Sequence, residues 1–196
     1  MGQAEFFDSI AKEWDDIIEV NEYKINILLS KLNIKDNTNI LDVGTGTGVL
    51  IPFIKQLNPN GNITGIDISK EMINIASEKF KDINKLSFKL VNVENGITNG
   101  EYDKIILYSM FPHLQNRTST IKSLVHNNLK DGGQLMIAHS NSREFLNNMH
   151  KEKNEVVRED RLICVKSQKN LFEEAGLNVV EAFENDDIYY LVINKN

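Results

Sequence analysis

The chain has 196 residues, of which 41% are hydrophobic and 26% charged, so we expect one domain, residues 1–196, built around a single core. The formal net charge of −6 argues against a nucleic-acid partner, because gripping phosphates needs a basic surface. The single cysteine allows no internal disulfide, and neither a signal peptide nor a long apolar run is present. These features predict a cytoplasmic protein without a membrane partner. The oligomeric state stays open.

Two amphipathic helices are predicted within residues 1–35. Apolar side chains recur at helical spacing in two groups. The first group is Phe7, Ile10, Trp14 and Ile17, and the second is Ile25, Leu28, Leu29 and Leu32.

From residue 36 onward, short β-rich runs alternate with segments of helical period. The β-rich runs are NILDV, ITGID, LSFKLV, YDKIILY, QLMIAH, LNVVEAF and IYYLVIN. The helical segments include VLIPFIKQL, SKEMINIASEKF with Ser69 as N-cap, RTSTIKSLVHNNL, and LFEEA with Gly176 as its stop. This alternation predicts a doubly wound α/β fold with a mostly parallel sheet. Only ENDD separates the last two runs, which predicts an antiparallel hairpin.

The first strand leads into the glycine-rich stretch ILDVGTGTG, residues 40–48. The dinucleotide fingerprint G-x-G-x-x-G needs a third glycine where this chain has Val49, and the G-K-[ST] of a phosphate-binding loop is absent. Nineteen residues past Gly48, Asp67 stands at the tip of the second strand. A carboxylate there suits the two ribose hydroxyls of an adenosine whose base lies along Ile68. The sequence therefore favours an adenosine ligand other than NAD.

Four motifs in order, ILDVGTGTG, GIDIS with Met72, YDKIILY and LKDGGQLMIAH, resemble those of class I S-adenosylmethionine-dependent methyltransferases. The resemblance runs from about Phe6 to the end of the chain. It implies a Rossmann-like, seven-stranded sheet whose last strand is antiparallel, and S-adenosylmethionine as the cofactor.

By the same resemblance, one set of residues would hold the cofactor. Asp42 and the glycine loop would face its methionine part, Asp67 its ribose, and the remaining members its adenine. The set is Asp42, Gly44, Thr45, Gly46, Gly48, Asp67, Ile68, Met72, Asn92, Val93 and Glu94. Many relatives carry Asp where this chain has Asn92. Plainer roles stay open: Asp42 as a cap of the turn, the glycines in helix packing, Asp67 as a loop acid, and Ile68 and Met72 in the core.

The opening FFDSIAKEWDD resembles the lid helix of small-molecule methyltransferases of the quinone and sterol type. This implies a lid over residues 1–35, a core over 36–196 and a substrate-side insertion at about 141–165. Phe7 and Trp14 are candidate lid aromatics, or they pack on the core. YSMFPHL, which begins with Tyr108, a candidate residue of the substrate pocket, replaces the Asn/Asp-Pro-Pro-aromatic motif of enzymes that methylate base nitrogens. A small-molecule acceptor is therefore expected.

Three histidines fall where the acceptor is expected: His113 after the fourth strand, His139 at the tip of the fifth, and His150 in the next helix. For the first two, a general base or substrate contact, a structural hydrogen bond and a metal ligand all stay open. No metal is expected, although these three would be the ligands of one.

With Ser142 as N-cap, the spacing of Arg143, Asn147 and His150 places them on one helix face that is expected to look into the substrate pocket, although a surface position is favoured for His150. His126 is expected on the surface, and Cys164 in a buried strand.

The nature of the acceptor atom stays open. So do three alternative functions: other chemistry with the same cofactor, metal-assisted methyl transfer, and non-catalytic cofactor binding.

Overall fold

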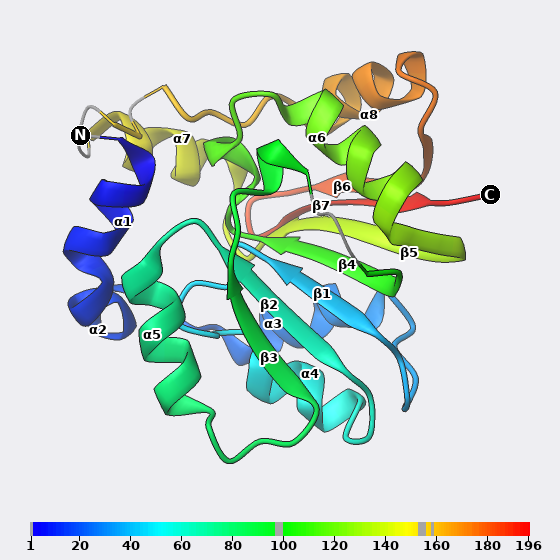
Figure 1. Cartoon of the computed structure of the whole chain (residues 1–196). Helices are drawn as coiled ribbons and strands as arrows, with labels where there is room; N and C mark the ends of the chain where they lie inside the picture. The colour runs from blue at the N-terminus through cyan, green and yellow to red at the C-terminus, as the bar shows by residue number, and fades with distance from the viewer. Residues whose placement is uncertain (1, 97–99, 153–155, 158) are drawn as a thin grey trace.

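The computed structural model describes residues 2–96, 100–152, 156–157 and 159–196 (Figure 1). The described strands form a seven-stranded sheet in the order β3-β2-β1-β4-β5-β7-β6. Their bounds are β1 Ile40–Val43, β2 Ile63–Asp67, β3 Leu86–Leu90, β4 Tyr102–Tyr108, β5 Leu129–His139, β6 Asn178–Glu184 and β7 Tyr189–Asn194.

Strands β1 to β5 pair in parallel, and β7 runs antiparallel to both β5 and β6. The short turn before β7 is fixed by Asn185, whose side-chain oxygen accepts the amide protons of Asp187 and Ile188. The predicted doubly wound sheet with an antiparallel last strand is confirmed. Chain order reverses between β1 and β4, and the carboxyl ends of strands at such a point are the usual ligand site of an α/β sheet.

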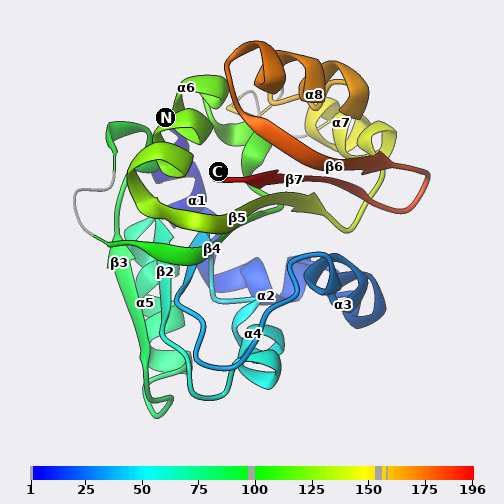
Figure 2. The same cartoon turned by 90° about the vertical axis from the view of Figure 1, so that its right-hand side faces the viewer.

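Helices cover both faces of the sheet (Figure 2). On one face lie α3, Glu22–Ser30, and α4, Ile51–Leu57. On the other lie α6, Arg117–Ser123, and α8, Val165–Glu174. Helix α5, Lys70–Lys79, packs along β2 and β3. The second predicted helix of the 1–35 segment is thus a core helix: Ile25, Leu28, Leu29 and Leu32 share one apolar cluster with side chains of α4 and β1.

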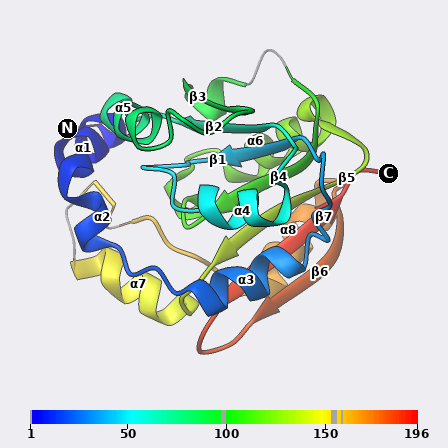
Figure 3. The same cartoon turned by 90° about the horizontal axis from the view of Figure 1, so that it is seen from below.

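The first helical segment lies apart from the sheet. It comprises α1 Gln3–Ile10, the 3₁₀ turn η1 Ala11–Glu13 and α2 Trp14–Ile17. In Figure 3 this segment extends from the neighbourhood of α5 toward α7, Arg143–Glu152. Of the predicted lid, residues 1–35, this segment and the adjoining Ile18 and Glu19 line the cavity at the carboxyl ends of the strands, whereas α3 packs in the core.

Two carboxylates attach this segment to the core. Asp8 accepts hydrogen bonds from the Ser69 hydroxyl, 2.5 Å, and the Glu71 amide, 3.0 Å, at the start of α5. The Ser69 bond is the main cause that lowers the pKa of Asp8. Asp15 accepts from the Thr47 hydroxyl at 2.5 Å and lies 2.6 Å from the Lys79 ammonium.

Three local expectations need correction. Strand β5 begins at Leu129, earlier than QLMIAH, because LKDGG is held by hydrogen bonds that Gly132 and Gly133 exchange with Lys195. The helix after β4 ends in a π-helical turn, η4 Leu124–Asn128, in which His126 is exposed as expected. Cys164 is exposed and immediately precedes α8, so its assignment to a buried strand is wrong.

The caps at Ser69, Ser142 and Gly176 are confirmed: the two serine oxygens accept the amides of Met72 and Phe145, and Gly176 has φ +85° after α8. Among the described helices, none combines the length and the apolar character that crossing a membrane requires.

Candidate active site

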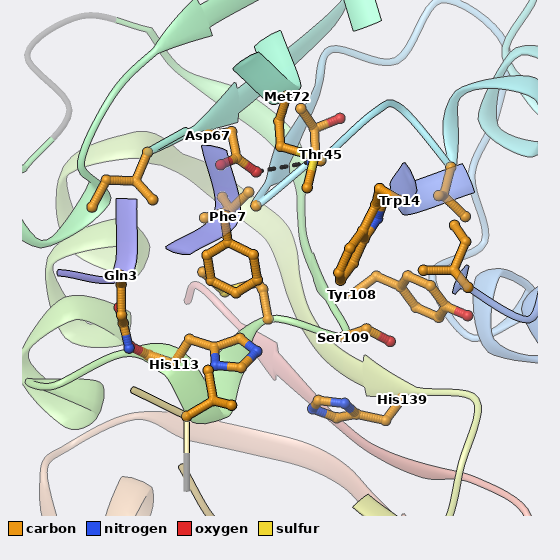
Figure 4. Close-up of a pocket in the computed structure, with 18 of the residues that line it drawn as sticks. Gln3, Phe7, Trp14, Thr45, Asp67, Met72, Tyr108, Ser109, His113 and His139 are labelled. Atoms are coloured by element: carbon orange, nitrogen blue, oxygen red, sulfur yellow. Dashed lines mark hydrogen bonds between the residues drawn. The ribbon is translucent and has the colours of Figure 1, made fainter. Parts of the chain in front are cut away.

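A cavity of about 390 Å³ lies beyond the carboxyl ends of the parallel strands, under α1 and α2 (Figure 4). This volume falls within the range of about 300 to 1,000 Å³ typical of small-molecule sites. The loops after β1, β2 and β3 form one wall, and the ends of β4 and β5 with α7 form the other. We call these the strand-loop wall and the histidine wall.

The glycine loop begins the strand-loop wall. Gly44, Gly46 and Gly48 all have positive φ, a conformation that side chains rarely adopt. A Cβ on Gly46 would point into open space, with the Trp14 ring nitrogen its nearest neighbour at 3.5 Å, so this glycine keeps the cavity free. A Cβ on Gly44 would lie 2.7 Å from the Met110 side chain.

Gly48 has a different role from the one expected. It does not line the cavity, and its Cβ would lie 2.5 Å from the Phe80 ring. The glycine is needed there because the C-cap residue of α5, Phe80, packs against the loop. The prediction that Gly48 faces the cofactor is therefore not supported, whereas Gly44, Thr45 and Gly46 do line the cavity.

Asp42 lies at the floor of the cavity and is 2% exposed. Its carboxylate accepts a hydrogen bond of 2.7 Å from the Thr45 hydroxyl. Burial, with a smaller contribution from nearby Asp67, raises its pKa to about 7. No Lys or Arg of the described chain pairs with it. Asp42 therefore caps the turn and also offers an uncompensated acid group to a ligand.

Asp67 ends β2 and joins the glycine loop to α5. One carboxylate oxygen accepts the Gly46 amide and the other accepts the Ser69 amide, both at 2.9 Å. Burial raises the pKa of Asp67, although these hydrogen bonds oppose the shift. Each oxygen keeps a further lone pair, which leaves the carboxylate able to accept ligand hydroxyls. Ile68 and Met72 line the cavity beside it, and Met72 is also part of the core.

The turn after β3 completes this wall with Asn92, Val93 and Glu94. The Asn92 side-chain oxygen accepts the Glu94 amide at 3.0 Å, so it caps the 3₁₀ turn η2, Val93–Asn95. Glu94 in turn accepts the Asn116 amide at 2.6 Å. The Asn92 amide group is the part of this side chain left for a ligand.

The predicted aromatics border the cavity from above and from the side (Figure 4). Phe7 packs edge-on against Trp14, with ring centroids 6.0 Å apart, and against His113 at 5.2 Å. Tyr108 closes the far side and donates its hydroxyl proton to Ser140 at 2.7 Å. Phe7 and Trp14 thus connect α1 and α2 to the histidine wall.

The histidine wall contains a pair that the sequence did not reveal. His113 ends the turn η3, Phe111–His113, and its Nδ1 lies 2.7 Å from the buried carboxylate of Asp160. Gln3 braces the pair by donating to the His113 carbonyl at 2.9 Å and to Asp160 at 3.4 Å. Nε2 of His113 makes no hydrogen bond to the described residues, so the pair presents a free ring nitrogen to the cavity.

His139, at the end of β5, is 1% exposed and lines the same cavity. Neither ring nitrogen has a hydrogen-bond partner in the described part of the chain. Burial, followed by the proximity of His113 and His150, lowers its pKa to about 3. His139 is therefore a much weaker base than an ordinary histidine, and its imidazole is neutral at physiological pH.

Helix α7 contributes one of its three predicted pocket residues. His150 lines the cavity, is 5% exposed and lies 5.3 Å from the His113 ring, so its favoured surface position is wrong. Its Nδ1 is hydrogen-bonded to the main-chain oxygen of Asp160. Arg143 instead pairs with Glu184 at 3.1 Å, and Asn147 exchanges two hydrogen bonds with the Leu162 main chain. Their face of the helix meets β6 and the segment before α8, not the cavity.

The histidines do not form a metal-binding group. Within the described residues, no three His, Cys, Asp or Glu side chains converge in an arrangement that holds a metal ion. The geometry instead pairs His113 with a carboxylate and leaves His139 separate.

The order and directions of the strands are those of the methyltransferase-type α/β fold, which solved structures share. A SAM dependent methyltransferase from Aquifex aeolicus has a TM-score of 0.72 and 21% identity, covering 95% of this chain and 97% of that one. DhpI, solved in complex with SAM and HEP, has a TM-score of 0.76 and 16% identity, covering 98% of this chain and 95% of that one.

A family model described as a methyltransferase domain matches residues 34–195, and the chain belongs to this family. A malonyl-[acyl-carrier protein] O-methyltransferase of Acetivibrio thermocellus is 33% identical over 128 residues, which are 64% of this chain and 45% of that protein. The chain spans about half the length of the curated relatives it matches.

Proposed function

We propose that this protein transfers a methyl group from S-adenosylmethionine to a small-molecule acceptor. The observation that carries this proposal is that one cavity joins two walls of different chemistry. The strand-loop wall has buried acids and an open glycine turn, and the histidine wall has a carboxylate-supported imidazole. Membership of the methyltransferase-domain family supports the same conclusion.

The residues present suit this cofactor, which is a cation without phosphates. Asp42, an unpaired buried acid, would hold its ammonium group. Asp67 would accept the ribose hydroxyls. Gly46 leaves room for the part of the cofactor that connects the ammonium group to the ribose. Ile68, Met72 and the turn at 92–94 would border the adenine. When bound, the cofactor supplies a methyl group made electrophilic by a positively charged sulfur.

His113 is proposed as the general base, a role that imidazole fills in many enzymes. Asp160, bonded to Nδ1, holds the ring in the tautomer that leaves Nε2 unprotonated. The acceptor's X–H proton moves to Nε2 while its lone pair forms the bond to the methyl carbon. The electron pair of the broken carbon–sulfur bond stays on sulfur. Asp160 stabilises the resulting imidazolium, so it acts as a positioning residue.

We also propose one domain, 1–196, with a lid in residues 1–35 and a substrate-side insertion at about 141–165, of which 153–155 and 158 lie outside the described residues. The protein is proposed to act in the cytoplasm, on a small molecule and without a nucleic-acid partner. Most of the rate enhancement would come from holding the acceptor atom in line with the methyl group in a cavity without water.

The test combines a turnover assay with calorimetry. Wild-type protein with methyl-labelled cofactor and pooled metabolites is expected to form S-adenosylhomocysteine and a labelled product. His113→Ala is expected to lower turnover by about 10²- to 10⁴-fold, as for loss of a general base, with cofactor affinity unchanged. Asp160→Asn should lower turnover less and shift its pH profile, and His126→Ala, on the exposed η4 turn, is the control.

Three results would change the proposal. Cofactor binding without any transfer would favour a non-catalytic binding protein. Consumption of cofactor without S-adenosylhomocysteine would indicate other chemistry. Activity that a chelator abolishes and added metal restores would replace the base with a metal site.

A further inference from the structure

We infer that the acceptor is an uncharged hydroxyl compound with an apolar body, of the phenol class, bound with its oxygen between His113 and His139. This inference rests on the proposed function and specifies the substrate of the same site. Three features support it: the charge of the cavity wall, the unpartnered His139 imidazole and the number of lone pairs that the acceptor atom needs.

The wall of the cavity carries carboxylic acids but no lysine or arginine among the described residues. The acids that line it are Glu19, Asp42, Asp67 and Glu94. The half-buried Arg117, four residues after His113, donates its hydrogen bonds to the carbonyls of Leu114, Pro112 and Arg161. A carboxylate acceptor would therefore find no lysine or arginine on the cavity wall to offset the cost of its desolvation.

The buried ring of His139 lacks a hydrogen-bond partner among the described residues, and a bound ligand could provide one. A neutral imidazole has one N–H donor and one acceptor nitrogen, and here both are buried and lack partners in the described chain. Buried polar groups of this kind are normally hydrogen-bonded, so each exception needs an explanation. The ring belongs to the cavity lining, and in Figure 4 His139 and His113 lie on the same side of it, below Phe7. A ligand atom that accepts a hydrogen bond would satisfy the N–H.

The number of lone pairs separates the acceptor classes. A hydroxyl oxygen can give its proton to His113, use one lone pair to attack the methyl carbon, and still accept the His139 N–H with its second lone pair. An amine nitrogen has a single lone pair, which must attack, so it cannot also accept from His139. A carboxylate has no proton to give to His113. The two histidines together therefore fit an oxygen acceptor that carries a proton.

The rest of the acceptor meets apolar side chains. The same cavity is lined by Phe7, which packs against the His113 ring, and by Leu114, Leu146, Met149 and Val157. Flat aromatic rings pack well against such surfaces and contribute large apolar area. A phenol combines this body with a hydroxyl that His113 can deprotonate as the new oxygen–carbon bond forms and the carbon–sulfur bond breaks.

Three probes with the same rings and different head groups test the inference: 2-naphthol, 2-naphthoic acid and 2-naphthylamine. Calorimetry on protein loaded with S-adenosylhomocysteine measures binding, and labelled cofactor measures transfer. We expect 2-naphthol to bind at least tenfold more tightly than the other two and to be the one that is methylated. Tighter binding of the acid or amine, or no binding of 2-naphthol, would overturn the inference.

Two variants tie the preference to the residues. His139→Leu should lose at least tenfold in 2-naphthol affinity and leave the affinity for the other probes and the cofactor unchanged; an unaltered 2-naphthol affinity would remove His139 from recognition. Met149→Lys, which places a cation in the wall, should shift the preference by at least tenfold toward 2-naphthoic acid. A wild type that binds no cofactor would contradict the proposed function, whereas normal cofactor binding without 2-naphthol preference contradicts this inference alone.

Discussion

Cofactor binding is expected to depend on pH through Asp42. This carboxyl group is buried without a cation, and its pKa is raised to about 7, chiefly by burial. A ligand ammonium requires the ionised form, so binding must remove the proton. With a pKa of about 7, half of the groups are ionised at pH 7 and about 1% at pH 5, which predicts affinity about 50-fold weaker at pH 5.

Calorimetry with S-adenosylhomocysteine from pH 5 to pH 7 measures this effect directly. Repeating the titration at pH 6 in buffers of different ionisation enthalpy should reveal the release of nearly one proton on binding. Asp42→Asn should bind weakly at every pH and lose most of the slope, and any residual slope reports Asp67, whose pKa burial also raises. Asp82→Asn, at an exposed position, is the matched control.

The reasoning is refuted if wild-type affinity changes by less than about threefold over this range. It is equally refuted if Asp42→Asn keeps the wild-type slope. In either case the acid at the cavity floor would not meet the charged end of the ligand.

Three further predictions concern the strand-loop wall. Asp67→Ala should weaken S-adenosylhomocysteine binding by about 1.5 to 3 kcal/mol, the range for hydrogen bonds to a charged group, and unchanged calorimetric affinity in a folded variant would count against the ribose assignment. Gly46→Val should abolish binding, because Gly46 has φ +54° and the added side chain would enter the cavity that it lines. Gly132→Val, with φ +72° and open space around its Cβ, is the control and should keep binding. Equal binding by the two variants would show that the loop does not approach the ligand. The stability of the unliganded protein should show the opposite pH trend from binding. The pKa of Asp42 is higher in the folded state, about 7, than the unfolded value of 3.8, so its contribution to stability is fully present below pH 3.8 and is lost as pH rises through about 7. The melting temperature of wild type relative to Asp42→Asn should therefore fall from pH 5 to pH 8, and a rise would contradict the raised pKa.

The sequence predicted the features that depend on local pattern. Strand and helix periodicity led to the correct sheet, including the antiparallel last strand, because four residues between two β-rich runs leave no room for a crossover helix. The family followed from motif order and is confirmed. The members of the cofactor set that line the cavity follow the carboxyl ends of β1, β2 and β3, where topology places them.

Features that depend on tertiary packing were not predictable. Asp160 is 47 positions from His113 and lies in an irregular segment, so no spacing rule connects the two. Helical periodicity correctly put Arg143 and His150 on related faces, but it does not say that one meets Glu184 and the other the cavity. In the sequence, Gly48 has the same spacing as Gly44 and Gly46, and its contact with Phe80 exists only in the folded chain.

Under the proposed function, the attachments of α1 and α2 would set the order of events in a catalytic cycle. Asp8 and Asp15 hold the segment to Ser69 and Thr47 beside the strand-loop wall, and Gln3 holds it to His113 on the other wall. In a reacting complex, this one short stretch of chain would lie across the exit of both products. We expect a burst of methylated product in the first turnover followed by a slower steady rate, in which detachment of this stretch, rather than bond making, limits how often the enzyme works.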